Sequence, residues 1–278
     1  MPIAERAVQE YYRVDDLGTA ILAALERAGR DLAALDPAEL APVDEFHVRG
    51  RVATAELVRL AEPQEGDRVL DVGCGLGGSA RYLAAERGCR VVGLDLTWEY
   101  CRAAALLSAR LDLEERTTFV QGNALRLPFA DACFDLVWTE HVQMNIADKG
   151  RFYAEIVRVL RPAGRLAFYD LFQGPGGEPY YPLPWAEDAT ISALETPATL
   201  AGVLREHGLR VRRWIDGTAE AVQWFRQALQ RGPAQGRPAL SLHLLLGPKA
   251  RQKSENLLRN LEEGRIVLLE AVLERPSD

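Results

Sequence analysis

The feature that most constrains the fold is the stretch from residue 69 to 84, "VLDVGCGLGGSARYLA", in which an apolar strand pattern runs into a glycine-rich turn and then a helix pattern. Parallel sheets bind ligands at the carboxyl ends of their strands, where glycine lets a ligand approach the backbone closely. Gly73, Gly75 and Gly78 satisfy the G-x-G-x-x-G spacing of dinucleotide-binding turns. Taken alone, this spacing predicts a nucleotide-containing ligand without selecting one.

The surrounding region, from residue 67 to about 171, alternates short apolar runs with helix-period patterns. This alternation predicts crossover units and a parallel sheet covered by helices on both faces. Before it, residues 1–62 read as a helical cap with a loop at 35–50, because apolar residues recur there three and four positions apart. We therefore expect a cap over 1–62 and a main domain over 63–278, together forming a single structural unit.

Composition narrows the possible partners. The 278 residues carry a formal charge of -7, which argues against a dominant nucleic-acid or anionic-membrane surface. The four cysteines form no pair or cysteine-histidine cluster with the spacing of a metal site, so no metal is expected. The charged start and the lack of a run of about 18 apolar residues favour a cytoplasmic protein without a membrane span. The sequence does not indicate whether the protein is a monomer or an oligomer.

The residue that discriminates between ligands is Asp71, two positions before the first glycine. A carboxylate facing the turn would repel a pyrophosphate but suits a cationic group, such as the ammonium of S-adenosylmethionine. Asp95, at the end of the next strand pattern, suits two ribose hydroxyls. Asn123 would bond an adenine edge, and Ala124 leaves room for the ring.

Four motifs carry a resemblance to a known family: "LDVGCGLGG", "GLDLT", "GNALRLPFADACFDLVW" and "RVLRPAGRLAFYD". In this order they resemble the class I S-adenosylmethionine-dependent methyltransferases over roughly residues 50–275. The resemblance implies a Rossmann-like, doubly wound α/β fold whose sheet has seven strands, six parallel and the last, "RIVLLEAVL", antiparallel. It implies S-adenosylmethionine as cofactor, S-adenosylhomocysteine as product, and contacts at Asp71, Gly73, Cys74, Gly75, Asp95, Leu96, Asn123 and Ala124.

The N-terminal segment "QEYYRVDDLG…DEFHVRGRVAT" is similar to sarcosine/dimethylglycine N-methyltransferases and, more distantly, to phosphoethanolamine methyltransferases. In those enzymes it covers the active site, so the resemblance implies a small polar acceptor, most simply an amine. Three alternatives stay open: an O- or C-methyltransferase of a natural product or isoprenoid, an NAD(P)-dependent oxidoreductase, and a protein that holds the cofactor without transferring methyl groups.

His141 is the candidate catalytic base, because it follows the fourth strand pattern in "TEHVQMNIADKG" and an amine must lose a proton before it is methylated. Phosphoethanolamine methyltransferases place a catalytic histidine four positions later, where this chain has Asn145. His141 is therefore a proton acceptor, a positioning residue or an ordinary loop residue. Its neighbour Glu140 is either a carboxylate for cofactor or acceptor, or a charge at a helix start.

Further candidates come from the flanking segments. Arg51 and His47 would hold the cofactor carboxylate or an acidic acceptor, or lie in a solvated loop. Asp170 would bind an acceptor cation or cap a loop. The complete set of expected acceptor contacts is Tyr12, His47, Met144, Asn145, Asp170 and Trp185.

Overall fold

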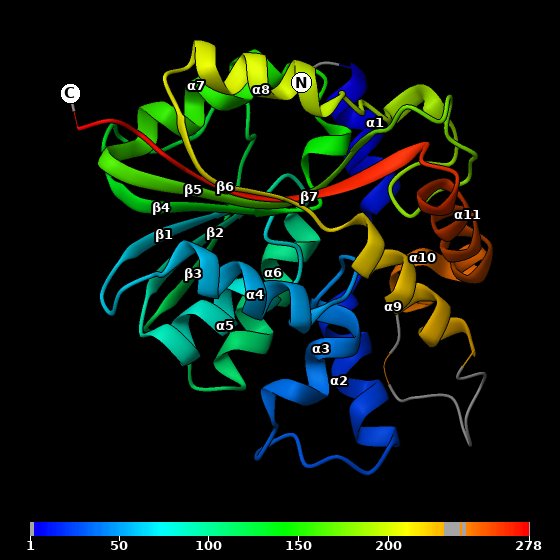
Figure 1. Cartoon of the computed structure of the whole chain (residues 1–278). Coiled ribbons are helices and arrows are strands. Elements are labelled where there is room, and N and C mark those ends of the chain that lie inside the picture. The colour runs from blue at the N-terminus through cyan, green and yellow to red at the C-terminus, as the bar shows by residue number, and fades with distance from the viewer. Residues whose placement is uncertain (1–2, 231–239, 241–242, 278) are drawn as a thin grey trace.

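The computed structural model describes residues 3–230, 240 and 243–277. Its centre is a seven-stranded sheet with the order β3-β2-β1-β4-β5-β7-β6 (Figure 1). β7 is antiparallel to both neighbours, whereas the pairings among β1 to β5 are parallel. The predicted fold is thus confirmed. The strands are β1 Arg68–Val72, β2 Arg90–Asp95, β3 Thr117–Gln121, β4 Phe134–Glu140, β5 Leu160–Gln173, β6 Arg210–Asp216 and β7 Ile266–Glu274.

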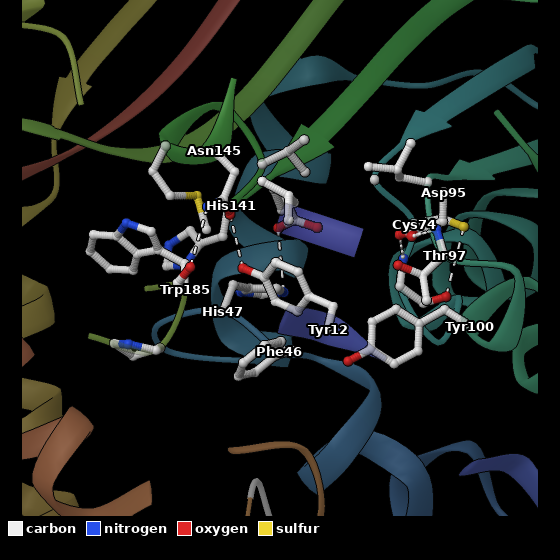
Figure 2. Close-up of a pocket in the computed structure, with 18 of the residues that line it drawn as sticks. Tyr12, Phe46, His47, Cys74, Asp95, Thr97, Tyr100, His141, Asn145 and Trp185 are labelled. Atoms are coloured by element: carbon white, nitrogen blue, oxygen red, sulfur yellow. Dashed lines mark hydrogen bonds and ion pairs between the residues drawn. The ribbon is translucent and has the colours of Figure 1, made fainter. Parts of the chain in front are cut away.

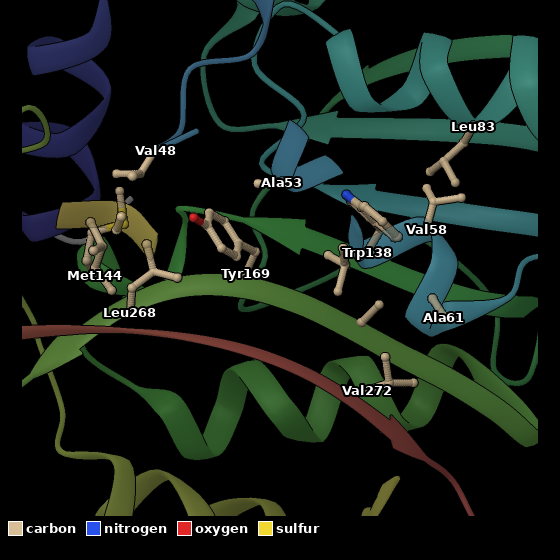
Figure 3. Packing of buried hydrophobic residues seen from close by; sticks show 14 of the residues in the cluster. Val48, Ala53, Val58, Ala61, Leu83, Trp138, Met144, Tyr169, Leu268 and Val272 are labelled. Carbon is tan, nitrogen blue, oxygen red and sulfur yellow. The ribbon is translucent and has the colours of Figure 1, made fainter. Parts of the chain in front are cut away.

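Helices cover both faces of the sheet (Figure 1). One face carries α4 Arg51–Ala61, α5 Gly78–Arg87 and α6 Trp98–Ala109; the other carries α7 Lys149–Val159 and α8 Pro197–Glu206. Successive strand residues alternate between the two cores, with Val69 in one and Leu70 in the other. Figure 3 shows Trp138 and Tyr169 packed in the core beneath α4.

The N-terminal cap consists of α1 Ile3–Tyr12, α2 Leu17–Arg27 and α3 Pro37–Asp44. The expected loop at 35–50 is wrong in its first part, because α3 occupies it. Asp36 accepts a hydrogen bond from the amide of Ala38, and Glu39 accepts one from the amide of Asp36, which together form a capping box. α4, by contrast, packs against β5, β7 and α5, so it belongs to the layer on the sheet.

The C-terminal helices lie at one end of the sheet (Figure 1). They are α9 Thr218–Gln230, α10 His243–Leu246 and α11 Ala250–Glu262, and α9 packs against α11 and β7. Short 3-10 turns occur at Gln143–Asn145, Ala189–Ile191 and Gly247–Lys249. In the described part of the chain, no helix has the length and hydropathy of a membrane span, and no group of three or more histidine, cysteine or acidic residues could hold a metal ion.

Candidate active site

A cavity of about 620 Å³ opens at the carboxyl ends of β1, β2 and β4. Its size is within the range of roughly 300–1,000 Å³ that small-molecule sites occupy. The loops after the strands form one side and α1 crosses the cavity. The end of α3 with the loop after it, the segment around Trp185, and α9 to α11 also contribute to the wall. In Figure 2, Tyr12 of α1 lies between a group that contains Asp95, Thr97 and Tyr100 and a group that contains His141, Asn145 and Trp185.

The glycine turn after β1 has two positions that need glycine for different reasons. Gly73 has φ +73°, and a Cβ there would lie 2.2 Å from Cγ2 of Val142, so glycine lets the loop after β4 pack onto the turn. Gly75 has φ +51°, and a Cβ there would meet nothing within 4 Å, because this part of the backbone faces the cavity. The amide of Gly75 donates a 3.0 Å hydrogen bond to Oδ2 of Asp95, which ties the turn to β2.

Asp71 lines the cavity with a buried carboxylate. Only 3% of the residue is exposed, and its Oδ2 has no hydrogen-bond partner among the described residues. Burial raises the pKa of Asp71 well above its usual range, and nearby Glu140 and Asp95 raise it further. A buried carboxylate without a partner is costly, so a cationic group bound beside it would stabilise the charged form. The ammonium of S-adenosylmethionine fits this requirement.

Asp95 is held at the cavity edge by two backbone amides. Its Oδ1 accepts from the amide of Thr97 at 2.8 Å, and its Oδ2 accepts from Gly75. A carboxylate oxygen can accept more than one hydrogen bond, so both remain able to accept from ribose hydroxyls. The carbonyl of Leu96 accepts from Gln9 of α1 at 3.1 Å, which brings α1 over the end of β2. Thr97 and Tyr100 also line this side, and sequence reasoning missed both.

The loop after β3 lies beside Asp95 in the cavity wall. Oδ1 of Asn123 accepts from the amide of Leu125 at 2.8 Å, so the side chain is oriented by its own turn. Ala124 lines the cavity with its small side chain, and Cys74 lines it from the glycine turn. Every residue that the family resemblance implies for the cofactor therefore lies on this one cavity.

A buried polar network joins the glycine turn to the cap. Glu140, the last residue of β4, accepts from the Ser79 hydroxyl and from Nε1 of Trp138 at 2.8 Å. Nε2 of His47 lies 3.1 Å from Oε2 of Glu45 and 3.6 Å from Oε1 of Glu140. Burial lowers the pKa of His47, but the two carboxylates outweigh burial and raise it to about 9, so His47 is protonated at neutral pH.

Two of the alternatives considered for these residues are wrong. Glu140 does not sit at the helix start, because α7 begins later and is capped by Asp148, whose carboxylate accepts from the amide of Arg151 at 2.8 Å. His47 does not lie in a solvated loop, because only 5% of its side chain is exposed. Both side chains line the cavity.

His141 follows β4 with a left-handed backbone, φ +51°, which is uncommon for a residue other than glycine. Its amide donates to the carbonyl of Tyr169 at 2.9 Å, and its ring stacks on that of Tyr169 with centroids 5.4 Å apart. Burial, and then the positive charge of His47, lower the pKa of His141 well below its usual value. Its Nε2 is buried and has no partner among the described residues, and His141 is one of the residues that line the cavity.

Asn145 connects the cap to the segment after β5. Its Oδ1 accepts from the hydroxyl of Tyr12 at 2.9 Å, while its Nδ2 donates to the carbonyls of Trp185 at 3.2 Å and Ile191 at 2.8 Å. Its amide is thus used for internal hydrogen bonds. Met144 and Trp185 also line the cavity, and they are 4% and 1% exposed.

Two predicted site residues lie outside the cavity wall. Arg51 donates from Nε to Oε1 of Glu45 at 3.2 Å and from a terminal nitrogen to the carbonyl of Pro37 at 3.1 Å, so it neutralises the network behind His47. Oδ2 of Asp170 accepts from the amides of Val142 and Gln143, each at 2.9 Å. Arg51 therefore supports His47 instead of lining the cavity, and Asp170 anchors the loop that carries His141, which is the second of the two roles expected for it.

The residues that sequence reasoning missed are mainly apolar and come from the cap and the C-terminal helices. No motif marks them, because they lie far apart in the sequence and read as ordinary core positions. They include Val8, Phe46, Trp224, Phe225, Leu246 and Leu257.

The comparison with protein families matches residues 70–168 to the model described as "Methyltransferase domain". Among curated relatives, Methyltransferase GfsG of Streptomyces halstedii is 35% identical over 136 residues, which are 49% of this chain and 48% of that protein. The chloroplastic tocopherol O-methyltransferase of Arabidopsis thaliana is 40% identical over 105 residues, 38% of this chain and 30% of that protein. The chain thus matches less than half the length of these relatives.

Solved structures share the whole architecture. The geranyl diphosphate C-methyltransferase from Streptomyces coelicolor A3(2) has a TM-score of 0.72 at 16% identity, over 99% of this chain and 98% of that one. The [4+2]-cyclase SpnF has 0.70 at 20%, over 100% and 98%. A putative sarcosine dimethylglycine methyltransferase from Galdieria sulphuraria has 0.63 at 18%, over 81% and 83%. At such identities the likeness shows the fold alone, whereas the family model locates the similarity to methyltransferase domains in residues 70–168.

Proposed function

We propose that the protein transfers a methyl group from S-adenosylmethionine to a small molecule. The observation that carries the proposal is the buried, unpartnered carboxylate of Asp71 beside the glycine turn, inside the segment that matches the methyltransferase family. When bound, S-adenosylmethionine supplies a methyl carbon activated by a positively charged sulfur. No metal or covalent enzyme intermediate is needed for such a displacement.

The cavity residues divide the binding of the cofactor among them. Asp71 binds the ammonium group and Asp95 the ribose hydroxyls, because each presents a carboxylate to the cavity. Gly75 allows close approach to the backbone. Asn123 and Ala124 form the adenine side, with Cys74 and Leu96 beside them. These roles rest on the matched motifs and on the shared cavity.

In this reaction His141 takes the proton that the methyl acceptor loses. Its low pKa keeps the imidazole neutral at neutral pH, and its Nε2 has no hydrogen-bond partner among the described residues. His47, with a pKa of about 9, is already protonated and cannot take this role at neutral pH. Much of the remaining rate enhancement would come from positioning and from exclusion of water in the buried cavity.

Calorimetry with S-adenosylhomocysteine tests the cofactor assignment. The wild-type protein should bind it, and Asp71→Asn should weaken binding about 10- to 100-fold, because a charge-assisted hydrogen bond is lost. Asp131→Asn is the matched control, since Asp131 is 77% exposed and pairs with Arg158 at the surface. Binding of NADH in place of S-adenosylhomocysteine would favour the oxidoreductase alternative and overturn the proposal.

The second candidate function is a cyclisation without methyl transfer. It is suggested by the [4+2]-cyclase SpnF, whose fold matches over the whole chain. Incubation with methyl-labelled S-adenosylmethionine and a cell metabolite extract separates the two: label should appear in a small molecule. If the protein binds S-adenosylmethionine tightly but no labelled small molecule forms, the cyclase alternative is favoured over methyl transfer.

A further inference from the structure

The wall of the cavity that α9 and α11 form, together with Met144 and Trp185, is mainly apolar. α9 contributes Trp224 and Phe225, α11 contributes Leu257, and Met144 and Trp185 face the same core cluster. Polar groups nearby are already bonded: the indole nitrogen of Trp185 donates to Ser192 at 3.1 Å. In the same way, the hydroxyl of Ser254 in α11 donates to the carbonyl of Ala250 at 2.9 Å. This wall offers contact area and few hydrogen bonds to a ligand.

The charged side chains that line the cavity are mostly negative. Among the described lining residues there is no lysine or arginine. The positive charge of His47 is held between Glu45 and Glu140, which leaves it no spare capacity for an anion. Carboxylates line the cavity at Glu5, Asp44, Asp71, Asp95, Glu140 and Asp148.

An anionic acceptor would enter this cavity without a partner. Burying an unpaired anion costs several kcal/mol, and neighbouring carboxylates add repulsion. An apolar molecule gains about 25 cal/mol for each Å² of apolar surface that it buries. The balance therefore favours ligands whose acceptor portion is large, apolar and free of negative charge.

We infer that the methyl acceptor is a mainly apolar molecule without a negative charge, whose bulk lies against α9, α10 and α11, with its reactive atom toward His141. The inference rests on the proposed function, because it assigns the remaining cavity to the acceptor. It favours the O- or C-methylation alternative over an amine of the sarcosine type, since sarcosine carries a carboxylate. A diphosphate ester likewise finds no cation among the described lining residues.

The test uses N-phenyl-1-naphthylamine, an uncharged apolar dye whose fluorescence rises when it is buried. The full-length protein, saturated with S-adenosylhomocysteine, is titrated with the dye in magnesium-free buffer. Geraniol and geranyl diphosphate then compete, because they share one hydrocarbon and differ in charge. Geraniol should displace the dye at a concentration at least about 10-fold lower, and sarcosine should not displace it.

Two leucines of α10 provide a matched pair of variants. Leu246 lines the cavity and is 7% exposed, whereas Leu244 is 37% exposed and is not part of the lining. Leu246→Ala should weaken dye binding about fivefold, and Leu244→Ala should leave it unchanged. Trp224→Ala, a second variant of the wall, replaces Leu246→Ala if that protein fails to fold. All three variants should bind S-adenosylhomocysteine with the affinity of the wild-type protein.

The outcomes separate the inference from the function on which it rests. If the wild-type protein does not bind S-adenosylhomocysteine, the proposed function fails. If it does bind and geranyl diphosphate displaces the dye as well as or better than geraniol, only the acceptor inference is overturned. If Leu246→Ala and Leu244→Ala change the affinity for the dye equally, the acceptor does not bind against α10 and the inferred position of the acceptor site is overturned.

Discussion

The two halves of the cavity are built in different ways. The cofactor half comes from loops that directly follow β1, β2, β3 and β4, and all of these lie within the matched segment 70–168. The acceptor half comes mainly from α1, the segment around Trp185 and α9 to α11, which are distant in the sequence and outside that segment; Met144 is the exception. A shared cofactor can therefore be recognised from one stretch of sequence, whereas the acceptor is specified by the packing of separate segments.

The halves also differ in their physical basis. On the cofactor side, backbone amides and carboxylates are fixed by hydrogen bonds, such as that from Gly75 to Asp95. On the acceptor side, large apolar side chains pack into one cluster with the sheet. Relatives can exchange apolar residues there with little loss of stability, since cores tolerate changes that conserve volume.

Breaking the cofactor half at Gly73 should have the largest effect. Gly73→Ala places a Cβ 2.2 Å from Val142 in a left-handed backbone. Overpacking and backbone strain together should lower the free energy of unfolding by about 4 kcal/mol. Urea denaturation measures this change, and calorimetry should show that S-adenosylhomocysteine binding is lost.

Gly75→Ala is the control, because its Cβ meets nothing within 4 Å and only the φ of +51° opposes it. It should cost about 1 kcal/mol. Similar losses in the two variants would mean that the contact of Gly73 with Val142 does not hold the cofactor half together.

The polar network should make stability depend on pH. His47 has a pKa of about 9 in the folded protein, above its usual 6.5. Its contribution is therefore fully present below pH 6.5 and is lost as the pH rises through 9, by about 3 kcal/mol in the free energy of unfolding. Denaturant unfolding between pH 6 and pH 10 measures it.

His47→Gln supplies the reference for that measurement. Subtracting its stability profile cancels other buried groups, including Asp170 and Glu270, whose pKa values burial raises to about 6 and about 7. A difference profile that is flat from pH 6 to pH 10 would show that Glu45 and Glu140 do not hold His47 protonated.

The sequence predicted the sheet and the cofactor half because both are local. Alternating patterns identify strands, and the carboxyl ends of parallel strands meet at one edge, which brings Asp71, Asp95 and Asn123 onto one cavity. The helix α3 was also locally encoded, in the Asp36 cap and the Glu39 that completes it, although we expected a loop there.

Other parts of the site depend on tertiary contacts that no local pattern records. A charged side chain near a site can turn to an internal partner, as Arg51 does toward Glu45 and Asp170 toward the amides after His141. The apolar wall of Trp224 and Leu257 reads as ordinary helix core until the fold brings α9 and α11 to the cavity. The predicted domain boundary at residue 62 stays a prediction.

The smallest of these effects concerns His141, where the two halves meet. His141→Asn keeps a residue that tolerates the left-handed backbone but removes the proton acceptor. With an acceptor found in the labelled-methyl screen, kcat should fall about 100-fold, or roughly 2.7 kcal/mol, while S-adenosylhomocysteine and dye affinities stay unchanged.

The pH profile of the wild-type enzyme sharpens this prediction. Because burial and His47 hold the pKa of His141 well below 6.5, its neutral form persists as the pH falls from 8 to 6.5, and kcat should stay level over that range. If His141→Asn instead keeps most of its turnover and weakens only acceptor binding, His141 belongs to the acceptor half as a positioning residue. Methyl transfer would then proceed without a base at this position. No base is needed when the atom that receives the methyl group carries no proton.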